Sequence, residues 1–149
     1  MMKNIDCSIP PGSHKTTYRH RVAFYETDAM GVVHHSNYLR FFEDARVAWL
    51  EEHDRRYTEY MAIGRNFAVT RVDISYHRSS RFHDNLAVTT ALKWVRGASA
   101  CFVYEIRCER DLVVTGFTEH AFVDGQGRPR RIPKEWREHL LSISADDST

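Results

Sequence analysis

The sequence predicts an α+β domain in which an antiparallel sheet of about five strands wraps around one long central helix. Two observations predict this class. Apolar residues recur at helical spacing on more than one side of residues 37–52, and four later segments alternate between apolar and polar residues. A helix that is apolar on several sides needs other structure around it, and strands with one apolar face can provide that cover.

The first half of the chain predicts one strand and two helices. Residues 17–25 alternate, which predicts a strand, and a turn follows it at Asp28–Gly31. Ser36 or Asn37 can then cap a helix that continues to about residue 52. Residues 54–66 are mixed in character and predict a short helix that ends near Gly64.

The second half predicts four strands and a short helix. The strands cover residues 67–76, 86–95, 98–109 and 113–123. In the second of these, strict alternation places Trp94 on the same face as Leu92. The connections near Gly97 and Asp111 are short enough for hairpins, and Pro133 can open a C-terminal helix.

The length of 149 residues fits one domain that can bury its own core. We expect this domain to cover residues 16–143. Residues 1–15 contain Pro10-Pro11-Gly12-Ser13 and lack periodicity, which predicts a flexible N-terminal arm. Residues 144–149 are expected to form a flexible C-terminal tail.

Charge and cysteine content narrow the protein's location and partners. Lys and Arg number 21 against 20 Asp and Glu, a formal charge of +1, so no overall field favours nucleic acid or an acidic membrane surface. The cysteines are odd in number, and Cys101 and Cys108 point to opposite faces of one predicted strand. With no run of about 18 apolar residues, the chain is expected to be cytoplasmic, without a membrane span and without a nucleic-acid partner.

The most informative segment is Asp28–Tyr38, which places an acid and a glycine turn directly before the long helix. A carboxylate that faces the free N–H groups of a helix N-terminus supplies two parts of an acyl-transfer site. The acid can act as nucleophile or base, while the backbone donors of residues 35–38 and the positive end of the helix dipole can polarise a carbonyl oxygen. The alternative is an ordinary turn aspartate.

This segment resembles the signature of the 4-hydroxybenzoyl-CoA thioesterase-like acyl-CoA thioesterases, which are hot-dog-fold enzymes. The matching residues are Asp28, Gly31, Val32-Val33, His35, Asn37-Tyr38 and Phe41-Phe42-Glu43-x-Ala45-Arg46. The resemblance extends from about residue 18 to about residue 133. It implies a hot-dog domain that hydrolyses an acyl-CoA thioester to a free acid and coenzyme A.

The resemblance also implies roles for individual residues. Asp28 and His35 are the expected catalytic residues: Asp28 attacks the thioester carbonyl or activates a water, and the His35 backbone N–H binds the thioester oxygen. Both routes for Asp28 stay open. The expected substrate-binding residues are Gly31, Val33, Tyr38 and Phe42.

A second part of the resemblance covers residues 75–86, a strand that leads through a loop into the next strand. It contains Arg78 and Arg81, which with Arg65 are candidates for binding the phosphates of coenzyme A. In the family the sheet edges pair across a dimer and the active site lies at that interface. The resemblance therefore implies a homodimer or a homotetramer.

Other reaction classes lack their motifs. The nine histidines and three cysteines show no H-E-x-x-H or C-x-x-C spacing, so no metal site is predicted, and no G-x-G-x-x-G, Walker A or G-x-S-x-G element occurs. No cofactor is expected, because coenzyme A is part of the substrate. The alternatives are a thioesterase that acts on an acyl carrier protein, a non-catalytic acyl-binding protein and, with less support, a hydratase.

Overall fold

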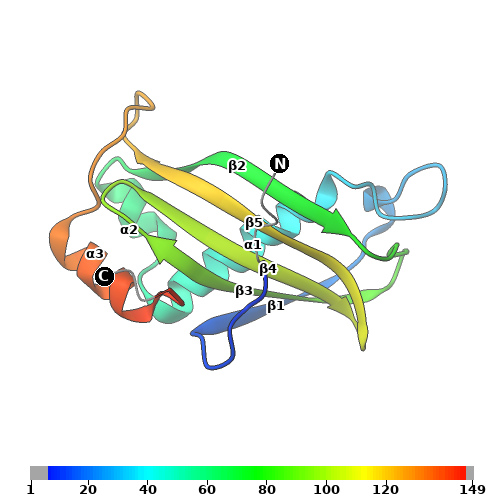
Figure 1. The fold of residues 1–149 in the computed structure, drawn as a ribbon. Coiled ribbons are helices and arrows are strands. Elements are labelled where there is room, and N and C mark those ends of the chain that lie inside the picture. Colours follow the sequence, from blue (N-terminus) through cyan, green and yellow to red (C-terminus); the bar gives the residue numbers. More distant parts are fainter. Residues whose placement is uncertain (1–6, 147–149) are drawn as a thin grey trace, which may run out of the picture.

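The computed structural model describes residues 7–146 and contains one five-stranded antiparallel sheet with a long helix on one face (Figure 1). The elements are β1 (Lys15–Arg21), a 3-10 turn η1 (Phe24–Glu26), α1 (Asn37–His53), α2 (Tyr57–Ala62), β2 (Asn66–Tyr76), β3 (Asn85–Val95), β4 (Ser99–Cys108), β5 (Asp111–Val123) and α3 (Lys134–Ile143). The strand order is β1-β3-β4-β5-β2, so β1 and β2 are the edges. The predicted antiparallel sheet and long helix are confirmed.

The long helix α1 buries its apolar side against the sheet. Phe41, Phe42, Ala45 and Trp49 lie at helical spacing and are almost wholly buried. Trp49 also donates its indole N–H to the carbonyl of His14 over 2.8 Å. The helix packs mainly against β1 and β3, which leaves the β2 side of the same face less covered. No helix among residues 7–146 has the length and apolar composition needed to cross a bilayer.

The edge strand β2 therefore keeps apolar side chains exposed on the helix side of the sheet. Val69, Val72 and Tyr76 pair with β5 residues that face α1, yet each keeps 40–50% of its surface exposed. Edge strands of this kind present unpaired backbone groups and favour pairing with another chain. The exposed edge of β2 lies beside the cleft described below.

Two predictions about the strands are wrong in detail. The first strand ends at Arg21 and does not continue to residue 25, because the Glu26 carboxylate accepts a hydrogen bond from the Ala23 N–H and the chain turns into η1. In β3, a bulge between Leu92 and Trp94 breaks the alternation. Trp94 consequently points to the outer face of the sheet, where it packs against a small outer cluster formed by Ala91, Cys101, Val103 and Phe117.

Both ends of the described chain lie against this sheet. Cys7 and Ile9, from the expected N-terminal arm, pack against the outer cluster. At the other end, the backbone N–H groups of residues 145 and 146 donate to carbonyls of β3 over 2.8 Å. These residues of the expected arm and tail thus contact the sheet, whereas residues 1–6 and 147–149 lie outside the described residues.

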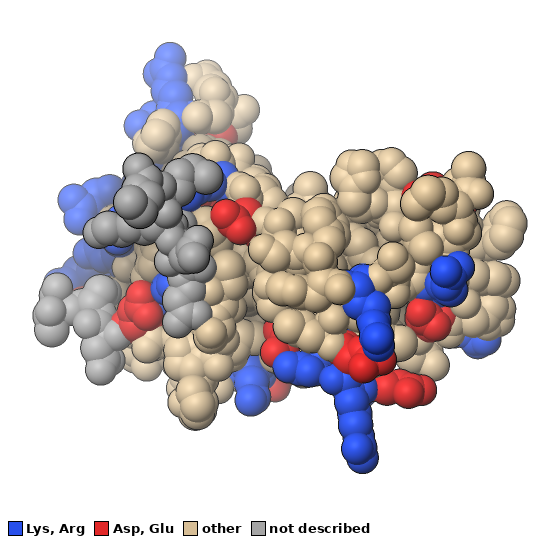
Figure 2. Space-filling view, turned by 45° about the vertical axis from the view of Figure 1, so that its right-hand side comes forward, with Lys and Arg blue, Asp and Glu red and all other residues tan. Residues whose placement is uncertain are grey.

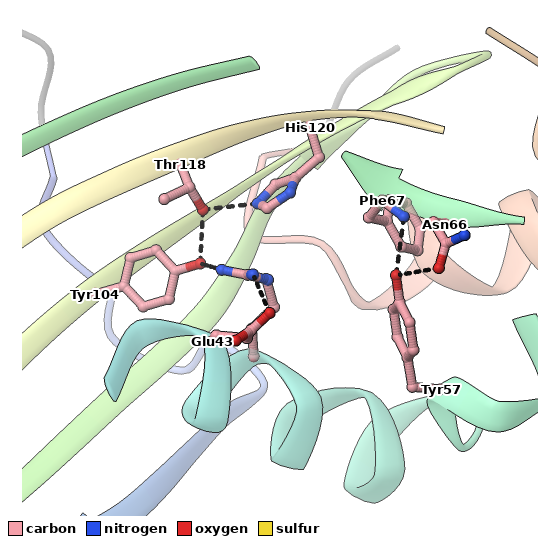
Figure 3. Close-up of polar contacts among 8 residues, drawn as sticks. Glu43, Tyr57, Asn66, Phe67, Tyr104, Thr118 and His120 are labelled. Carbon is pink, nitrogen blue, oxygen red and sulfur yellow. Dashed lines mark hydrogen bonds and ion pairs between the residues drawn. The ribbon is translucent and has the colours of Figure 1, made fainter. Parts of the chain in front are cut away.

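A chain of buried polar groups crosses the core from α1 to β5 (Figure 3). Arg46 donates to the Tyr104 hydroxyl over 3.0 Å. The Tyr104 hydroxyl lies 2.6 Å from the Thr118 hydroxyl, and the Thr118 hydroxyl lies 2.7 Å from His120 Nε2. The other ring nitrogen of His120 is buried and has no hydrogen-bond partner among residues 7–146. Burial, with the positive charge of Arg46 nearby, lowers the pKa of His120 to about 3.

This histidine is expected to make the fold acid-sensitive. Between pH 6.5 and about 3 the unfolded chain binds a proton at His120 that the folded chain excludes, so the free energy of unfolding falls as the pH is lowered through this window. One proton contributes a slope of up to about 1.4 kcal/mol per pH unit. We expect urea unfolding at several pH values to show that the free energy of unfolding changes less per pH unit for His120→Gln than for the wild type. An equal pH dependence of the free energy of unfolding in both proteins would contradict the lowered pKa of His120.

Candidate active site

The turn before α1 holds Asp28 in a defined geometry. Asp28 Oδ1 accepts the backbone N–H of Met30 over 2.9 Å and that of Val32 over 3.4 Å. The Gly31 N–H donates to the Asp28 carbonyl over 2.9 Å, and Gly31 has a φ of +78°, a conformation that other residues rarely adopt. Within the described chain the second carboxylate oxygen of Asp28 has no partner, so it is available to a ligand or a water.

A buried glutamate anchors this turn to the helix. Glu26 is buried, and its carboxylate lies 2.7 Å from both the Ala23 N–H and His20 Nε2. Its backbone carbonyl accepts the Asn37 side-chain amide over 2.8 Å and the His34 N–H over 2.9 Å. Glu26 and His20 do not stand out in the sequence, where they look like an ordinary turn acid and an alternating strand residue.

The N-terminus of α1 lies beside the same turn, but the Ser36 N–H donates to His34 Nδ1 over 3.2 Å and the Asn37 N–H donates to the His34 carbonyl over 2.9 Å. Ser36 occupies the N-cap position but its side chain makes no capping bond to the helix, and its hydroxyl lies 2.7 Å from His34 Nδ1 instead. Among residues 7–146 the His35 N–H has no hydrogen-bond acceptor, whereas its carbonyl accepts the Tyr76 hydroxyl over 3.3 Å. The His34 and His35 rings stack, with centroids 4.2 Å apart.

A cleft of about 340 Å³ joins these groups. Its lining residues come from the turn, from the start of α1 and from the end of β2: Asp28, Val32, Val33, His35, Tyr38, Tyr76, His77, Arg78 and Ser79. Five of the predicted site residues, Asp28, Val33, His35, Tyr38 and Arg78, thus line one cavity. The sequence did not point to Tyr76 or His77, because only strand pairing brings the end of β2 beside the turn.

The other two predicted substrate-binding residues lie outside the cleft. Gly31 shapes the turn but does not line the cavity. Phe42 is fully buried and stacks on Tyr104, with ring centroids 4.0 Å apart and planes within 7° of parallel. Its side chain supports the core beneath the helix, because helical spacing turns residue 42 toward the sheet.

The three candidate arginines lie in different places. Arg78 lines the cleft, and its guanidinium forms an ion pair with Asp111. Arg81 lies against the turn: a Cβ added to Gly31 would be 3.7 Å from Arg81 Nη1. Arg65 directly precedes β2, whose eleven residues separate it by roughly 30 Å from the cleft end of the strand. Within one chain, Arg65 and Arg81 cannot bind the same phosphate.

The ionisable groups that line the cleft include two tyrosines, the Asp28 carboxylate and Arg78. Burial raises the pKa values of Tyr38 and Tyr76 above their ordinary value, so both hydroxyls stay protonated near neutral pH. No group of three or more His, Cys, Asp or Glu side chains among residues 7–146 is arranged to hold a metal ion. The arrangement offers a carboxylate oxygen, an unpaired backbone N–H and the positive end of a 17-residue helix.

Comparisons with known proteins find relatives along most of this chain. Residues 22–140 match the profile of a family described as the thioesterase-like superfamily. A putative esterase of Aquifex aeolicus is 35% identical over 123 residues, which cover 83% of this chain and 95% of that protein. The acyl-CoA thioester hydrolase YbgC of Escherichia coli is 33% identical over 116 residues, covering 76% and 87%.

The fold has a close counterpart among solved structures. A hypothetical protein from Thermus thermophilus superposes with a TM-score of 0.82 at 32% sequence identity. The match covers 89% of this chain and 99% of that protein. The two folds therefore superpose over most of the length of both chains.

Proposed function

The chain belongs to the thioesterase-like superfamily, and from this membership we propose that it hydrolyses acyl-CoA thioesters to a free acid and coenzyme A. One observation carries the proposal. Asp28, with a free carboxylate oxygen, and His35, with an unpaired backbone N–H, line the same cleft at the N-terminus of α1. The cleft thus presents a nucleophile or base together with a donor for the developing oxyanion.

Two routes use the same residues. In the first, an Asp28 oxygen attacks the thioester carbon, the C–S bond breaks, coenzyme A leaves as a thiolate that takes up a proton, and water hydrolyses the resulting anhydride. In the second, Asp28 takes a proton from a water that attacks the thioester carbon directly, the C–S bond breaks, and coenzyme A leaves as a thiolate that takes up that proton. In both, the His35 N–H and the helix dipole stabilise the negative charge on the carbonyl oxygen.

We assign the remaining groups by their position in the cleft. Val33 and Tyr38 are the proposed contacts for the acyl group, and Gly31 allows the turn to bring Asp28 there. Arg78 and Arg81 are the proposed phosphate contacts at the rim. Water is the only co-reactant, so no cofactor is proposed. Cys7, Cys101 and Cys108 form no disulfide within the described residues, which is compatible with a cytoplasmic enzyme.

We also propose that the active enzyme is a homodimer, or a tetramer built from dimers. The exposed edge of β2 supports this, since its apolar residues Val69, Val72 and Tyr76 would be covered by a second copy. Antiparallel pairing of two β2 strands about Arg71 would bring Arg65 of the partner subunit toward the cleft. Light scattering of the purified protein measures the particle mass, and a monomer at micromolar concentration would contradict the proposal.

Thiol release by the wild type tests the function. The substrates are short and long aliphatic, aromatic and arylacetyl CoA thioesters, together with one acyl thioester of an acyl carrier protein. We expect clear turnover of at least one CoA thioester. Turnover of the carrier-protein thioester alone would change the donor, and no turnover of any thioester would favour a non-catalytic acyl-binding protein.

A further inference from the structure

A patch of exposed aromatic side chains lies next to the candidate active site. Phe24 is 72% exposed in η1, and Phe82 is 45% exposed in the loop between β2 and β3. Their rings meet edge to face with centroids 5.6 Å apart, and the ring centroids of Phe82 and His83 lie 3.8 Å apart. Phe24, Phe82 and His83 form what we call the aromatic platform.

The platform is continuous with the cleft, because the β2–β3 loop runs along the catalytic turn. Val33 N–H donates to the Ser80 carbonyl over 2.8 Å, Val32 pairs with Arg81, and the His83 N–H donates to the Val22 carbonyl over 3.1 Å. One end of this paired segment lies at the cleft and the other end at the platform. A ligand that extends out of the cleft along the loop passes Arg81 before it reaches the aromatic rings.

Positive charge lies along this path. In the described part of the chain the Arg81 guanidinium makes no ion pair, although it lies against the catalytic turn. Arg21 contacts His83 Nδ1 on the far side of the platform. Figure 2 turns this end of the molecule toward the viewer and shows a broad uncharged area with basic and acidic side chains gathered below it. Exposed aromatic rings beside two arginines suit a ligand that is both aromatic and anionic.

We propose that the aromatic platform and Arg81 bind the nucleotide of coenzyme A, with the adenine base against Phe24 and Phe82 and a phosphate at Arg81. This inference rests on the proposed function, and it adds where the part of the substrate remote from the thioester is recognised. Aromatic side chains stack on bases without needing a deep pocket, and an unpaired guanidinium forms charge-assisted hydrogen bonds to phosphate.

The spatial order of the groups favours this occupant. Asp28 and Val32 line the cleft, Arg81 pairs with Val32, and Phe82 follows Arg81 in the chain. This order matches the thioester, phosphate and base of an acyl-CoA. The proposed dimer edge, β2, is a separate strand from the segments that form the platform.

The test compares an acyl-CoA with the same acyl group on pantetheine, which lacks the nucleotide. For the wild type we expect kcat/KM to favour the CoA thioester at least tenfold, mainly through KM. Phe24→Leu, Phe82→Leu and Arg81→Gln should each reduce this preference several-fold. Tyr25→Ala is the matched control, because Tyr25 is 81% exposed on the same turn but makes no ring contact with the platform among residues 7–146.

Direct binding gives a second readout that does not depend on turnover. Adenosine 3′,5′-bisphosphate should bind the wild type and the Tyr25→Ala control in calorimetry, and at least fivefold more weakly the Phe82→Leu and Arg81→Gln variants. Equal kcat/KM for the CoA and pantetheine thioesters, with both hydrolysed, would overturn the nucleotide site and leave the thioesterase function standing. If neither thioester is hydrolysed, the proposed function fails and the calorimetry still decides the nucleotide site.

Two further outcomes would also overturn the inference. A carrier-protein thioester that is hydrolysed faster than the CoA thioester, and is slowed by the Phe24 and Phe82 variants, would make the platform a protein-docking surface. A change in particle mass caused by these variants would make it a contact between copies of the chain. Unchanged thermal unfolding in each variant shows that the measured effects do not come from loss of the fold.

Discussion

Replacement of Asp28 by Asn should lower kcat for thioester hydrolysis by roughly 10²–10⁴-fold, with a much smaller change in KM. The substitution separates a chemical role of Asp28 from a structural one, because the hydrogen bonds of the turn involve only one oxygen of the carboxylate. Asn keeps an acceptor for the Met30 and Val32 N–H groups and removes the negative charge and the nucleophilic oxygen. The chemistry should be lost while the turn remains.

The control for this variant is Glu51→Gln, which removes one carboxylate charge from an exposed position of α1 outside the cleft. Glu51→Gln should keep kcat within about twofold, because surface substitutions away from a site have small effects. Both variants should unfold within a few degrees of the wild type. Activity of Asp28→Asn within tenfold of the wild type would show that Asp28 is only a turn residue.

Replacement of Phe42 by Ala should lower the free energy of unfolding by about 3–5 kcal/mol. Phe42 is fully buried, stacks on Tyr104 and lies close to Gly116, where an added Cβ would be 3.1 Å from its ring. Removing the ring leaves a cavity between α1 and the sheet. For a domain of this size the midpoint of thermal unfolding should fall by roughly 6–20 °C.

Leu39→Ala is the matched control on the same helix, because Leu39 is partly exposed and should lose far less stability. The pair of variants also tests whether Phe42 contacts the substrate. If Phe42 lined the acyl site, Phe42→Ala would change the preference among acyl chain lengths with little loss of stability. The structure places Phe42 in the core, so we expect loss of stability with an unchanged rank order of substrates at a temperature where the variant is folded.

The secondary structure was largely predictable because its signals are local. The periodicities that distinguish α1 from the four later strands are set by side chains within one element, and the predicted bounds of α1 agree with Asn37–His53. The errors in detail have non-local causes. β1 stops at Arg21 because Glu26 draws the chain into a turn, and Trp94 points outward because of a bulge in the pairing of β3 with β4.

The lining of the candidate cleft was predictable mainly where it lies within one stretch of sequence. Asp28, Val33, His35 and Tyr38 come from the turn and the first turn of α1, and they line one cleft. The contribution of Tyr76, and the difference between Arg81 at the turn and Arg65 at the far end of β2, depend on how distant strands pair. No single segment of the sequence determines the register in which two strands pair.

The sequence by itself thus determined the classes of element and the placing of an acid and a glycine turn before a long helix, because both depend on neighbours in the chain. Only the tertiary structure decided which groups share the cleft. Two contacts join residues that the sequence separates: the hydrogen bond from the Asn37 amide to the Glu26 carbonyl, and the approach of Arg81 to Gly31. The burial of Phe42 shows toward which side of the helix its side chain points. Such contacts follow from packing of whole elements, and packing depends on all of them at once.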